Sequence, residues 1–527
     1  MSKIIKTTII LTIFSLAIRF FGLIREMVFA AFYGASSAMD AFVVASSVPS
    51  IFVGVAVTAI VTAFIPIYTE YKINSHYDDA ENFVHTIICI VIVITSAIVL
   101  ICFIFAPQII FALAPGFNIE TQRLATDLLR IMMPMLFFSG LLGIGSSLQQ
   151  ANNQFYYYAF SQLILNIVTI IVIVFFATRY GIFAAGVASV LSIIVQVLII
   201  SVGMPSCGYN KFRWNLNLRH PGIRKMVRFI MPVMIGLIIV DINSIVTRIL
   251  ASSLPSGSIS ALNYAIRVNL VFVSLLIYPV TTTIYPLLSQ QFEKNNINDF
   301  KRYINTATRL IVFLIIPIST MAAFFPNQLI SILFERGVFD KNSTAQTATI
   351  FMFYVLGLPG ISLMELLWKA FYSMKETIKP LAITTFVIVL NIILSIIFVK
   401  TLAAAGLALA ASIASTIGVF LQLYFLSKGL AGGLAVRRIF FSIFKAVICC
   451  IPMVIIAKII FYVGITFFSK DIFSIFFQNV ICLIIAGIVG FATYGVSSYI
   501  FNREDFHIMM ELVLRKIPIL KGRIAPA

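Results

Sequence analysis

Charged side chains are scarce in this chain. Aspartate, glutamate, lysine and arginine together make up 11% of its 527 residues, and 61% of the residues are hydrophobic. A soluble domain carries about 25% charged and about 45–50% apolar residues. Apolar runs of about 20 residues, long enough to cross a bilayer, recur from end to end. The scarcity of charge therefore argues against a soluble enzyme and predicts an all-α polytopic membrane protein.

Acidic residues are scarcer than basic ones, with 19 carboxylates against 37 lysines and arginines and a net charge of +18. In a soluble protein this excess would indicate a nucleic-acid partner. Here the cations lie mostly between the apolar runs, where the preference of cytoplasmic loops for positive charge explains them. We therefore expect no nucleic-acid partner.

Patterns for metal or nucleotide chemistry are missing. The chain has six cysteines and four histidines without ligand spacing, and it lacks GxGxxG, P-loop and HExxH motifs. All the cysteines but Cys207 lie inside apolar runs, where cysteine acts as a small hydrophobe. The sequence thus favours neither a bound metal nor a disulfide framework, and no cofactor is expected.

Run lengths and breaks predict about fourteen spanning helices. The predicted ranges are 7–33, 41–71, 83–112, 122–150, 155–178, 182–203, 225–252, 258–291, 301–334, 344–373, 379–399, 404–427, 437–463 and 473–500.

The two halves of the chain resemble each other at an offset near 220 residues. Pro134 aligns with Pro359 and Asn166 with Asn391, within two similar apolar stretches. Such repeats predict two pseudo-symmetric six-helix lobes, a transporter architecture, followed by two C-terminal helices. The assigned parts are an N-terminal lobe with helices one to six (1–204), a basic cytoplasmic loop (205–224), a C-terminal lobe with helices seven to twelve (225–428), helices thirteen and fourteen (429–500) and a cytoplasmic tail (501–527).

The distribution of cations predicts the orientation. The basic loop and the N-terminal Lys3 and Lys6 fall on one side of the membrane, whereas the opposite loops are short and nearly free of cations. Both termini are therefore expected to be cytoplasmic.

Several charges lie inside predicted helices. The first helix carries Arg19, Arg25 and Glu26, and the eighth carries Arg267. Each charge at the bilayer centre costs about 2.5–3.5 kcal/mol on insertion scales, so it must face a partner or a watery cavity. In these helices arginines outnumber carboxylates, which favours a cavity for an anionic guest. The alternative is a set of structural ion pairs.

The seventh helix carries Asp241 and Arg248, and two accounts of this pair stay open. Asp241 is either a static partner of Arg19 or Arg248, or it binds a proton or sodium ion with help from Asn391. In the second account this carboxylate couples an ion gradient to return of the carrier. Glu26 is a further candidate for ion pairing or ion coupling.

Several segments resemble the MurJ (MviN) family of lipid II flippases, part of the multidrug/oligosaccharidyl-lipid/polysaccharide exporter superfamily. They are "RFFGLIREMVFAAFYGASSAMDAFVVASSVPS", "TAFIPIYTEY", "LAPGF", "ALNYAIRV", "FERGVF" and "LGLPGISLMELLWKAFYSMKETIKP". The resemblance implies fourteen helices in two lobes around a cationic cavity. It also implies a substrate, undecaprenyl-pyrophosphoryl-disaccharide-pentapeptide, that crosses from the cytoplasmic to the outer leaflet for peptidoglycan synthesis. The family's functional residues carry over to Arg19, Arg25, Asp40 and Arg267.

This chain departs from the family pattern in helix two. Where many members place a pair of arginines after "VPS", it has "IFVGVAV", and the family's "RD" is "RE" at Arg25–Glu26. The pyrophosphate site would therefore hold fewer cations.

The expected function is that of a lipid II flippase in the bacterial cytoplasmic membrane. Such a protein works by alternating access and is not an enzyme. The expected partners are the lipid-linked precursor, membrane lipids and cell-wall synthesis proteins. Three alternatives stay open: a flippase for another polyprenyl-linked glycan, a cation-coupled multidrug exporter, and a non-transporting scaffold.

Overall fold

The computed structural model describes residues 2–74, 77–209, 213–217, 219–430, 432–467 and 475–514. These residues form helices and connecting loops, with no strand among them. Inside a bilayer the backbone finds no water, so a crossing segment must satisfy its own N–H and C=O groups, as a helix does. The predicted all-α class is confirmed.

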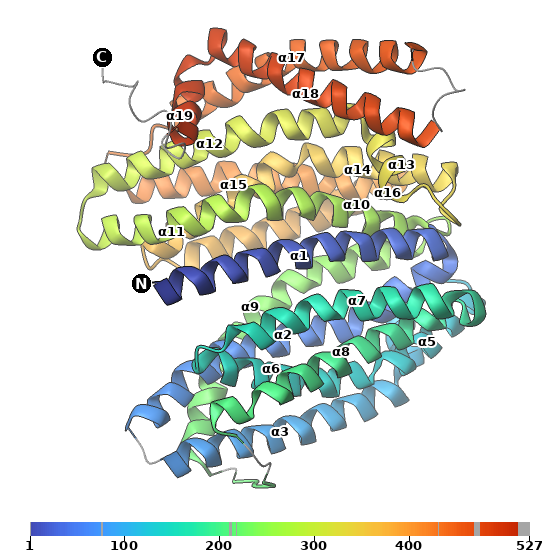
Figure 1. Cartoon of the computed structure of the whole chain (residues 1–527), viewed down its shortest axis with the longest axis vertical. Coiled ribbons are helices and arrows are strands. Elements are labelled where there is room, and N and C mark those ends of the chain that lie inside the picture. Colours follow the sequence, from blue (N-terminus) through green and yellow to red (C-terminus); the bar gives the residue numbers. More distant parts are fainter. Residues whose placement is uncertain are drawn as a thin grey trace. The chain divides into compact units, whose positions relative to one another are not determined.

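The chain divides into two compact units. Unit 1 comprises Met1–Asn263 and Arg336–Ser343, and unit 2 comprises Tyr264–Glu335 and Thr344–Ala527. The helices that begin in unit 1 are α1 (Ser2–Tyr33), α2 (Ser37–Asn74), α3 (Tyr77–Ile104), α4 (Ala106–Leu113), α5 (Ile119–Met132), α6 (Pro134–Ala151), α7 (Phe155–Tyr180), α8 (Phe183–Gly203), the short η1 (Pro205–Cys207), α9 (Pro221–Ser252), α10 (Ser258–Phe272) and α14 (Lys341–Leu356) (Figure 1). Those that begin in unit 2 are η2 (Val273–Ile277), α11 (Tyr278–Glu293), α12 (Ile297–Phe324), α13 (Pro326–Phe334), α15 (Leu358–Ser373), α16 (Ile378–Gly429), α17 (Val436–Phe467), α18 (Ile475–Phe501) and α19 (Arg503–Leu514). The lobe limits proposed from the repeat stay predictions.

Eleven helical segments among the described residues are long and apolar enough to cross a membrane, or twelve if the bent pair α14 and α15 is one span. The segment α16 counts once, although the non-helical residue Ala403 joins two helices within it. The helix α1 is not among the counted spans. The predicted count of about fourteen therefore stays a prediction.

Irregular backbone recurs at the repeat offset. One break separates α3 from α4 at Phe105, and another separates α12 from α13 at Phe325, 220 positions later. The turn after α7 has Gly181 at φ 55° and ψ −141°, and the turn inside α16 has Ala403 at φ 49° and ψ −131°, 222 positions later. These matching interruptions support an internal repeat more directly than similarity between apolar residues does.

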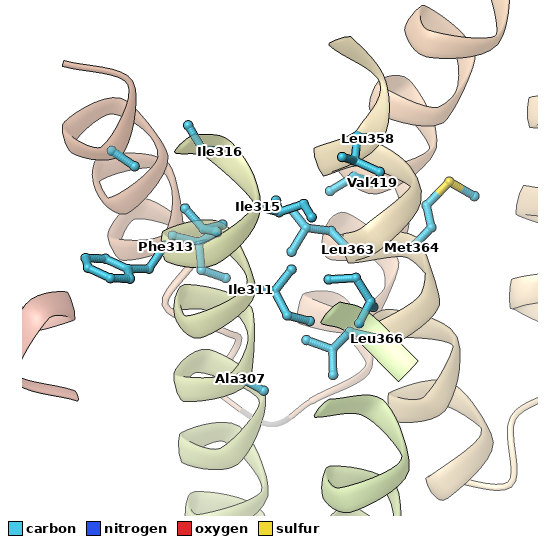
Figure 2. Packing of buried hydrophobic residues seen from close by; sticks show 14 of the residues in the cluster. Ala307, Ile311, Phe313, Ile315, Ile316, Leu358, Leu363, Met364, Leu366 and Val419 are labelled. Carbon is cyan, nitrogen blue, oxygen red and sulfur yellow. The ribbon is translucent and has the colours of Figure 1, made fainter. Parts of the chain in front are cut away.

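Close packing holds the core of unit 2 together. Ile311 and Ile315 of α12 lie on one helix stripe and face Leu363 and Leu366 of α15 (Figure 2). Lipid tails are as apolar as leucine, so in a membrane such contacts stabilise mainly through van der Waals packing. The packed stripe fixes α12 against α15 within the unit.

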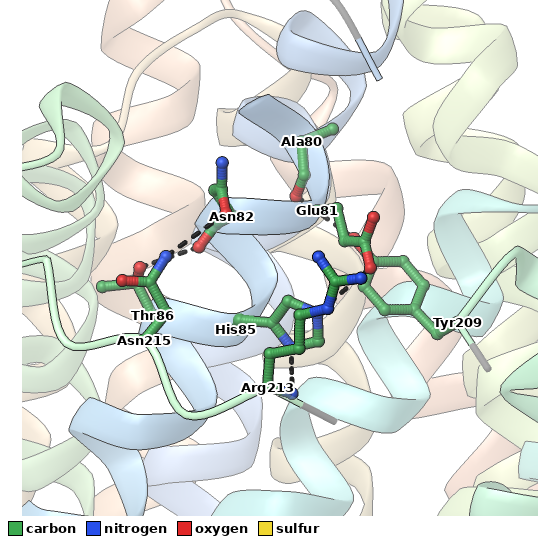
Figure 3. A network of polar contacts seen from close by, with 8 residues as sticks. All are labelled: Ala80, Glu81, Asn82, His85, Thr86, Tyr209, Arg213 and Asn215. Atoms are coloured by element: carbon green, nitrogen blue, oxygen red, sulfur yellow. Dashed lines mark hydrogen bonds and ion pairs between the residues drawn. The ribbon is translucent and has the colours of Figure 1, made fainter. Parts of the chain in front are cut away.

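The loop before α9 is attached to α3 in unit 1. Tyr209 donates a hydrogen bond to the carbonyl of Ala80 at 3.1 Å, and the backbone N–H of Arg213 donates to His85 Nδ1 at 3.4 Å (Figure 3). His85 is only 2% exposed. This part of the predicted basic loop is therefore ordered against a helix, while Asn210 and Lys211 lie outside the described residues.

Candidate functional site

The charges of α1 lie on a helix that packs along α7 in unit 1. Arg19 and Arg25 are half-buried, and Glu26 is buried with 7% of its surface exposed. Arg25 Nη2 donates to Glu26 Oε1 at 2.7 Å. Adjacent helix residues do not face each other, so the long arginine side chain must bend toward its neighbour. The structure thus gives Glu26 a partner within its own helix.

The guanidinium of Arg25 keeps binding capacity after this contact. Its Nε is buried and has no hydrogen-bond partner among the described residues. A guanidinium carries five N–H donors in a planar fork, and one carboxylate oxygen occupies only part of that fork. Arg25 can therefore donate to an additional anionic oxygen, such as one from a phosphate.

Asn166 of α7 lies against α1 close to Arg19. Its Nδ2 reaches the carbonyl of Ile18 at 3.5 Å, and a Cβ added to Gly22 would be 3.9 Å from its Oδ1. Asn166 is 5% exposed, so this amide is enclosed between the two helices. The sequence indicated Asn166 only as the repeat equivalent of Asn391, because nothing in one sequence reveals which helix an asparagine will face.

Asp40 in the first turn of α2 holds the start of α10. Its Oδ2 accepts from the backbone N–H of Gly257 and its Oδ1 accepts from that of Ser260, both at 2.7 Å. The carboxylate is 3% exposed. It therefore satisfies N–H groups that a helix N-terminus leaves open, and its charge suits that end of the helix dipole. A role in substrate binding stays a prediction for Asp40, whereas the capping contacts are direct.

We expect Asp40→Ala to destabilise the protein by about 1–3 kcal/mol, because two buried N–H groups lose a charged acceptor. Asp40→Asn should lose roughly half as much, since its amide keeps one acceptor oxygen. Thermal unfolding of purified protein in detergent measures both losses. Ser37→Ala, at an exposed position of the same helix turn, is the control. An unchanged melting temperature for Asp40→Ala would show that the Asp40 carboxylate does not stabilise the start of α10.

Arg267 lies in α10, whose last residue leads directly into the π-helical segment η2. Its side chain is exposed in the described structure. A π-helical turn adds a residue to the helix and occurs frequently at functional sites. Nothing in the residue pattern predicts this segment, because Val273–Ile277 contains neither glycine nor proline.

Asp241 and Arg248 lie two turns apart on α9, and both are half-buried. Both side chains therefore belong to one helix, and the two accounts of Asp241 stay predictions. Asn391 is in α16 of unit 2, where it accepts a hydrogen bond from Ser395 at 3.4 Å. Its cooperation with Asp241 stays a prediction, as does the coupling ion.

Three loops meet in unit 1 and form what we call the loop clasp, residues 34–36, 254–257 and 336–339. The N–H of Val338 donates to the carbonyl of Ala31, at the end of α1, at 2.9 Å. Gly257 and Gly337 have positive φ, and a Cβ at either would collide with a backbone carbonyl oxygen, of Ala35 and Ala31 respectively. Only glycine tolerates both constraints. Three segments that lie about 80 to 300 positions apart in the sequence thus meet through backbone atoms.

No cluster of three or more histidine, cysteine, aspartate or glutamate residues suited to a metal occurs in the described part of the chain.

Residues 29–483 match the sequence profile of a family described as "Lipid II flippase MurJ". The "Probable lipid II flippase MurJ" of Buchnera aphidicola subsp. Baizongia pistaciae is 32% identical over 80% of this chain and 82% of that protein. A solved structure, "Lipid II flippase MurJ, inward closed conformation", aligns with a TM-score of 0.79 at 27% identity, covering 94% of this chain and 99% of that one. An inward-facing MATE-family multidrug transporter, 13% identical with a TM-score of 0.65 over 79% of this chain and 97% of its own, shares the fold alone.

Proposed function

Because this chain belongs to the lipid II flippase MurJ family, we propose that it moves lipid II from the inner to the outer leaflet of the cytoplasmic membrane. It is a multi-pass bacterial membrane protein and a transporter, not an enzyme, since no bond is made or broken. Lipid II is the undecaprenyl-pyrophosphate-linked precursor of peptidoglycan, so the activity belongs to cell-wall synthesis. Alternating access of two lobes would carry the polar head group, while the polyprenyl tail stays in lipid.

The observation that carries the proposal is the retention of arginine in α1. Arg25 keeps a buried Nε without a hydrogen-bond partner among the described residues. An apolar helix bears the cost of such a charge only where it meets a partner, water or a ligand. A pyrophosphate offers oxygens that a guanidinium fork binds in pairs. We assign Arg19, Arg25 and Arg267 to this grip, and we assign Asp40 to positioning α10, the helix that carries Arg267.

The same charges bear on the alternatives. A multidrug exporter for cationic compounds would favour carboxylates in its cavity, whereas α1 carries Arg19 and Arg25 against the single carboxylate Glu26. A scaffold would have no need for half-buried arginines. A flippase for another polyprenyl-linked glycan would use the same pyrophosphate contact, so only the lipid that it moves separates it from a lipid II flippase. Proteins of cell-wall synthesis are proposed as partners because they would use the product.

Depletion of the protein tests the function. We expect lipid II to accumulate in the inner leaflet, and we expect re-expression of the wild-type chain to reverse this. Accumulation of a different polyprenyl-linked glycan, with normal lipid II levels, would assign the chain to the first alternative. Normal distribution of every lipid-linked precursor would reject transport altogether.

We further propose that both termini and the loop before α9 face the cytoplasm. A cysteine at Asn217, an exposed loop residue, should resist a membrane-impermeant thiol reagent in intact cells, and one at Glu120, before the body of α5, should react. The six native cysteines are buried, so their background should be low. Asn210 in the same loop lies outside the described residues. Labelling of the cysteine at Asn217 together with protection of the cysteine at Glu120 would show the opposite orientation.

A further inference from the structure

A basic cavity of about 620 Å³ lies in unit 2, where α12, the start of α17 and α19 come together. Its charged lining residues are Arg309, Arg437, Arg438, Lys445, Glu504 and Asp505. Figure 1 shows the short α19 beside the ends of α17 and α18. None of these residues belongs to the candidate substrate site, so the cavity needs an explanation of its own.

Both carboxylates in the cavity are already engaged by one arginine. Arg309 Nη2 contacts Glu504 Oε2 at 2.7 Å, and Arg309 Nε donates to Asp505 Oδ1. Asp505 is 2% exposed and also accepts from Asn502 at 2.9 Å. This network, which is buried at Asp505 and exposed at Glu504, fixes α19 to α12. It leaves the other cations of the cavity without a carboxylate partner among the described residues.

Those remaining cations lie in the first turns of α17. Arg437 and Arg438 are in the first turn, and Lys445 follows two turns later. The positive end of the helix dipole disfavours cations in a first turn, and this first turn contains no acidic residue. Positive charge is therefore concentrated where the helix itself opposes it. A bound anion would relieve that repulsion.

The surroundings of the cavity are those of a membrane interface. Phe441 lines it, and Phe440 and Phe444 on the same helix turns expose 40% and 62% of their side chains. The apolar span of α17 begins at Val436, within the same turn as the arginines. Aromatic side chains next to cations at the end of a span are typical of the head-group level of a bilayer.

We propose that this cavity binds the phosphate head group of an anionic phospholipid. Arg437 and Arg438 would hold the phosphate oxygens through their guanidinium forks, and Lys445 would contribute a point charge deeper along the helix. The acyl chains would then lie along the exposed phenylalanines of α17. Basic pockets between membrane helices bind phospholipid head groups in this way. The site is independent of the transport proposal, because it is defined by binding alone.

Lipid binding to the full-length protein tests this site. The protein would be placed in phosphatidylcholine nanodiscs and titrated with phosphatidylglycerol, with bound lipid counted by native mass spectrometry. We expect Arg437→Gln/Arg438→Gln to weaken phosphatidylglycerol binding at least about tenfold. The control is Lys428→Gln, an exposed cation at the end of α16 that does not line the cavity; its affinity should change by less than about twofold. Lys445→Gln provides a single substitution if the double variant does not fold.

Competition separates the two sources of a phosphate group. Millimolar inorganic phosphate should leave phosphatidylglycerol bound, because a soluble anion lacks the acyl contacts. Full displacement by phosphate would assign the cavity to a soluble anion and overturn the lipid proposal. Equal losses of phosphatidylglycerol affinity in the cavity variants and in Lys428→Gln would show a general attraction of basic residues for anionic lipid. That result would also overturn the lipid proposal.

Discussion

Alanine at Arg19, Arg25 or Arg267 is expected to abolish detectable lipid II transport while leaving expression intact. Under the proposed grip, each substitution would remove charge-assisted hydrogen bonds to the pyrophosphate, worth about 1.5–3 kcal/mol, or roughly a tenfold to hundredfold loss of binding. Lysine at the same positions should restore only part of the activity, since a point charge replaces the planar fork. Complementation of a depleted strain and flipping in reconstituted vesicles measure the loss.

The matched control is Arg179→Ala. Arg179 is exposed at the end of α7 and stacks on the neighbouring Tyr180, outside the proposed site. Its loss should leave transport near the wild-type level. Full transport by a chain with alanine at all three proposed positions would contradict a cationic grip on the substrate.

Under the ion-pair account, Asp241→Asn is expected to lower thermal stability, by up to about 3 kcal/mol, because it removes a carboxylate that balances the half-buried charge of Arg248. Adding Arg248→Gln should restore most of that loss, because removing both charges of a pair is far less harmful than removing one. Melting curves of Asp241→Asn, Arg248→Gln and the double variant, compared with the wild type, form the double-mutant cycle that measures this coupling.

The ion-coupling account makes a different forecast for the same substitution. Asp241→Asn would then fold and bind lipid II normally, yet transport would stop responding to a proton or sodium gradient. Flipping in vesicles with and without an imposed gradient provides this measurement. A variant with wild-type stability and wild-type gradient dependence would reject both accounts of Asp241.

Sequence patterns predicted the helices better than the contacts between them. The predicted range 155–178 became Phe155–Tyr180, because an apolar run of fixed length has few other places to end in a bilayer. The break between 399 and 404 was also predicted, and the structure places Ala403 there in a conformation unusual for a residue with a Cβ. Run length does not report short interruptions, so the break at Phe105 was missed.

The residues of the candidate site could be proposed from the sequence, but their contacts could not. The cost of charge in lipid was enough to indicate Arg19 and Arg25. The partners of Asp40 were not foreseeable, because they are backbone N–H groups about 220 residues away. Nor did helical periodicity suggest that Arg25 would bond to the adjacent Glu26, since it predicts neighbours three or four residues apart.

The loop clasp also bears on proteolysis. Proteases cut preferentially at exposed loop tips, and a cleavage site must be drawn out into an extended strand. In the clasp the N–H of Val338 is held by Ala31, and the N–H of Gly257 is held by Asp40. A protease acting at these loops must therefore first break contacts between segments distant in sequence. We expect limited digestion to leave the three loops of the clasp uncut. We also expect a reporter domain inserted into any one of these loops to separate the other two loops from each other.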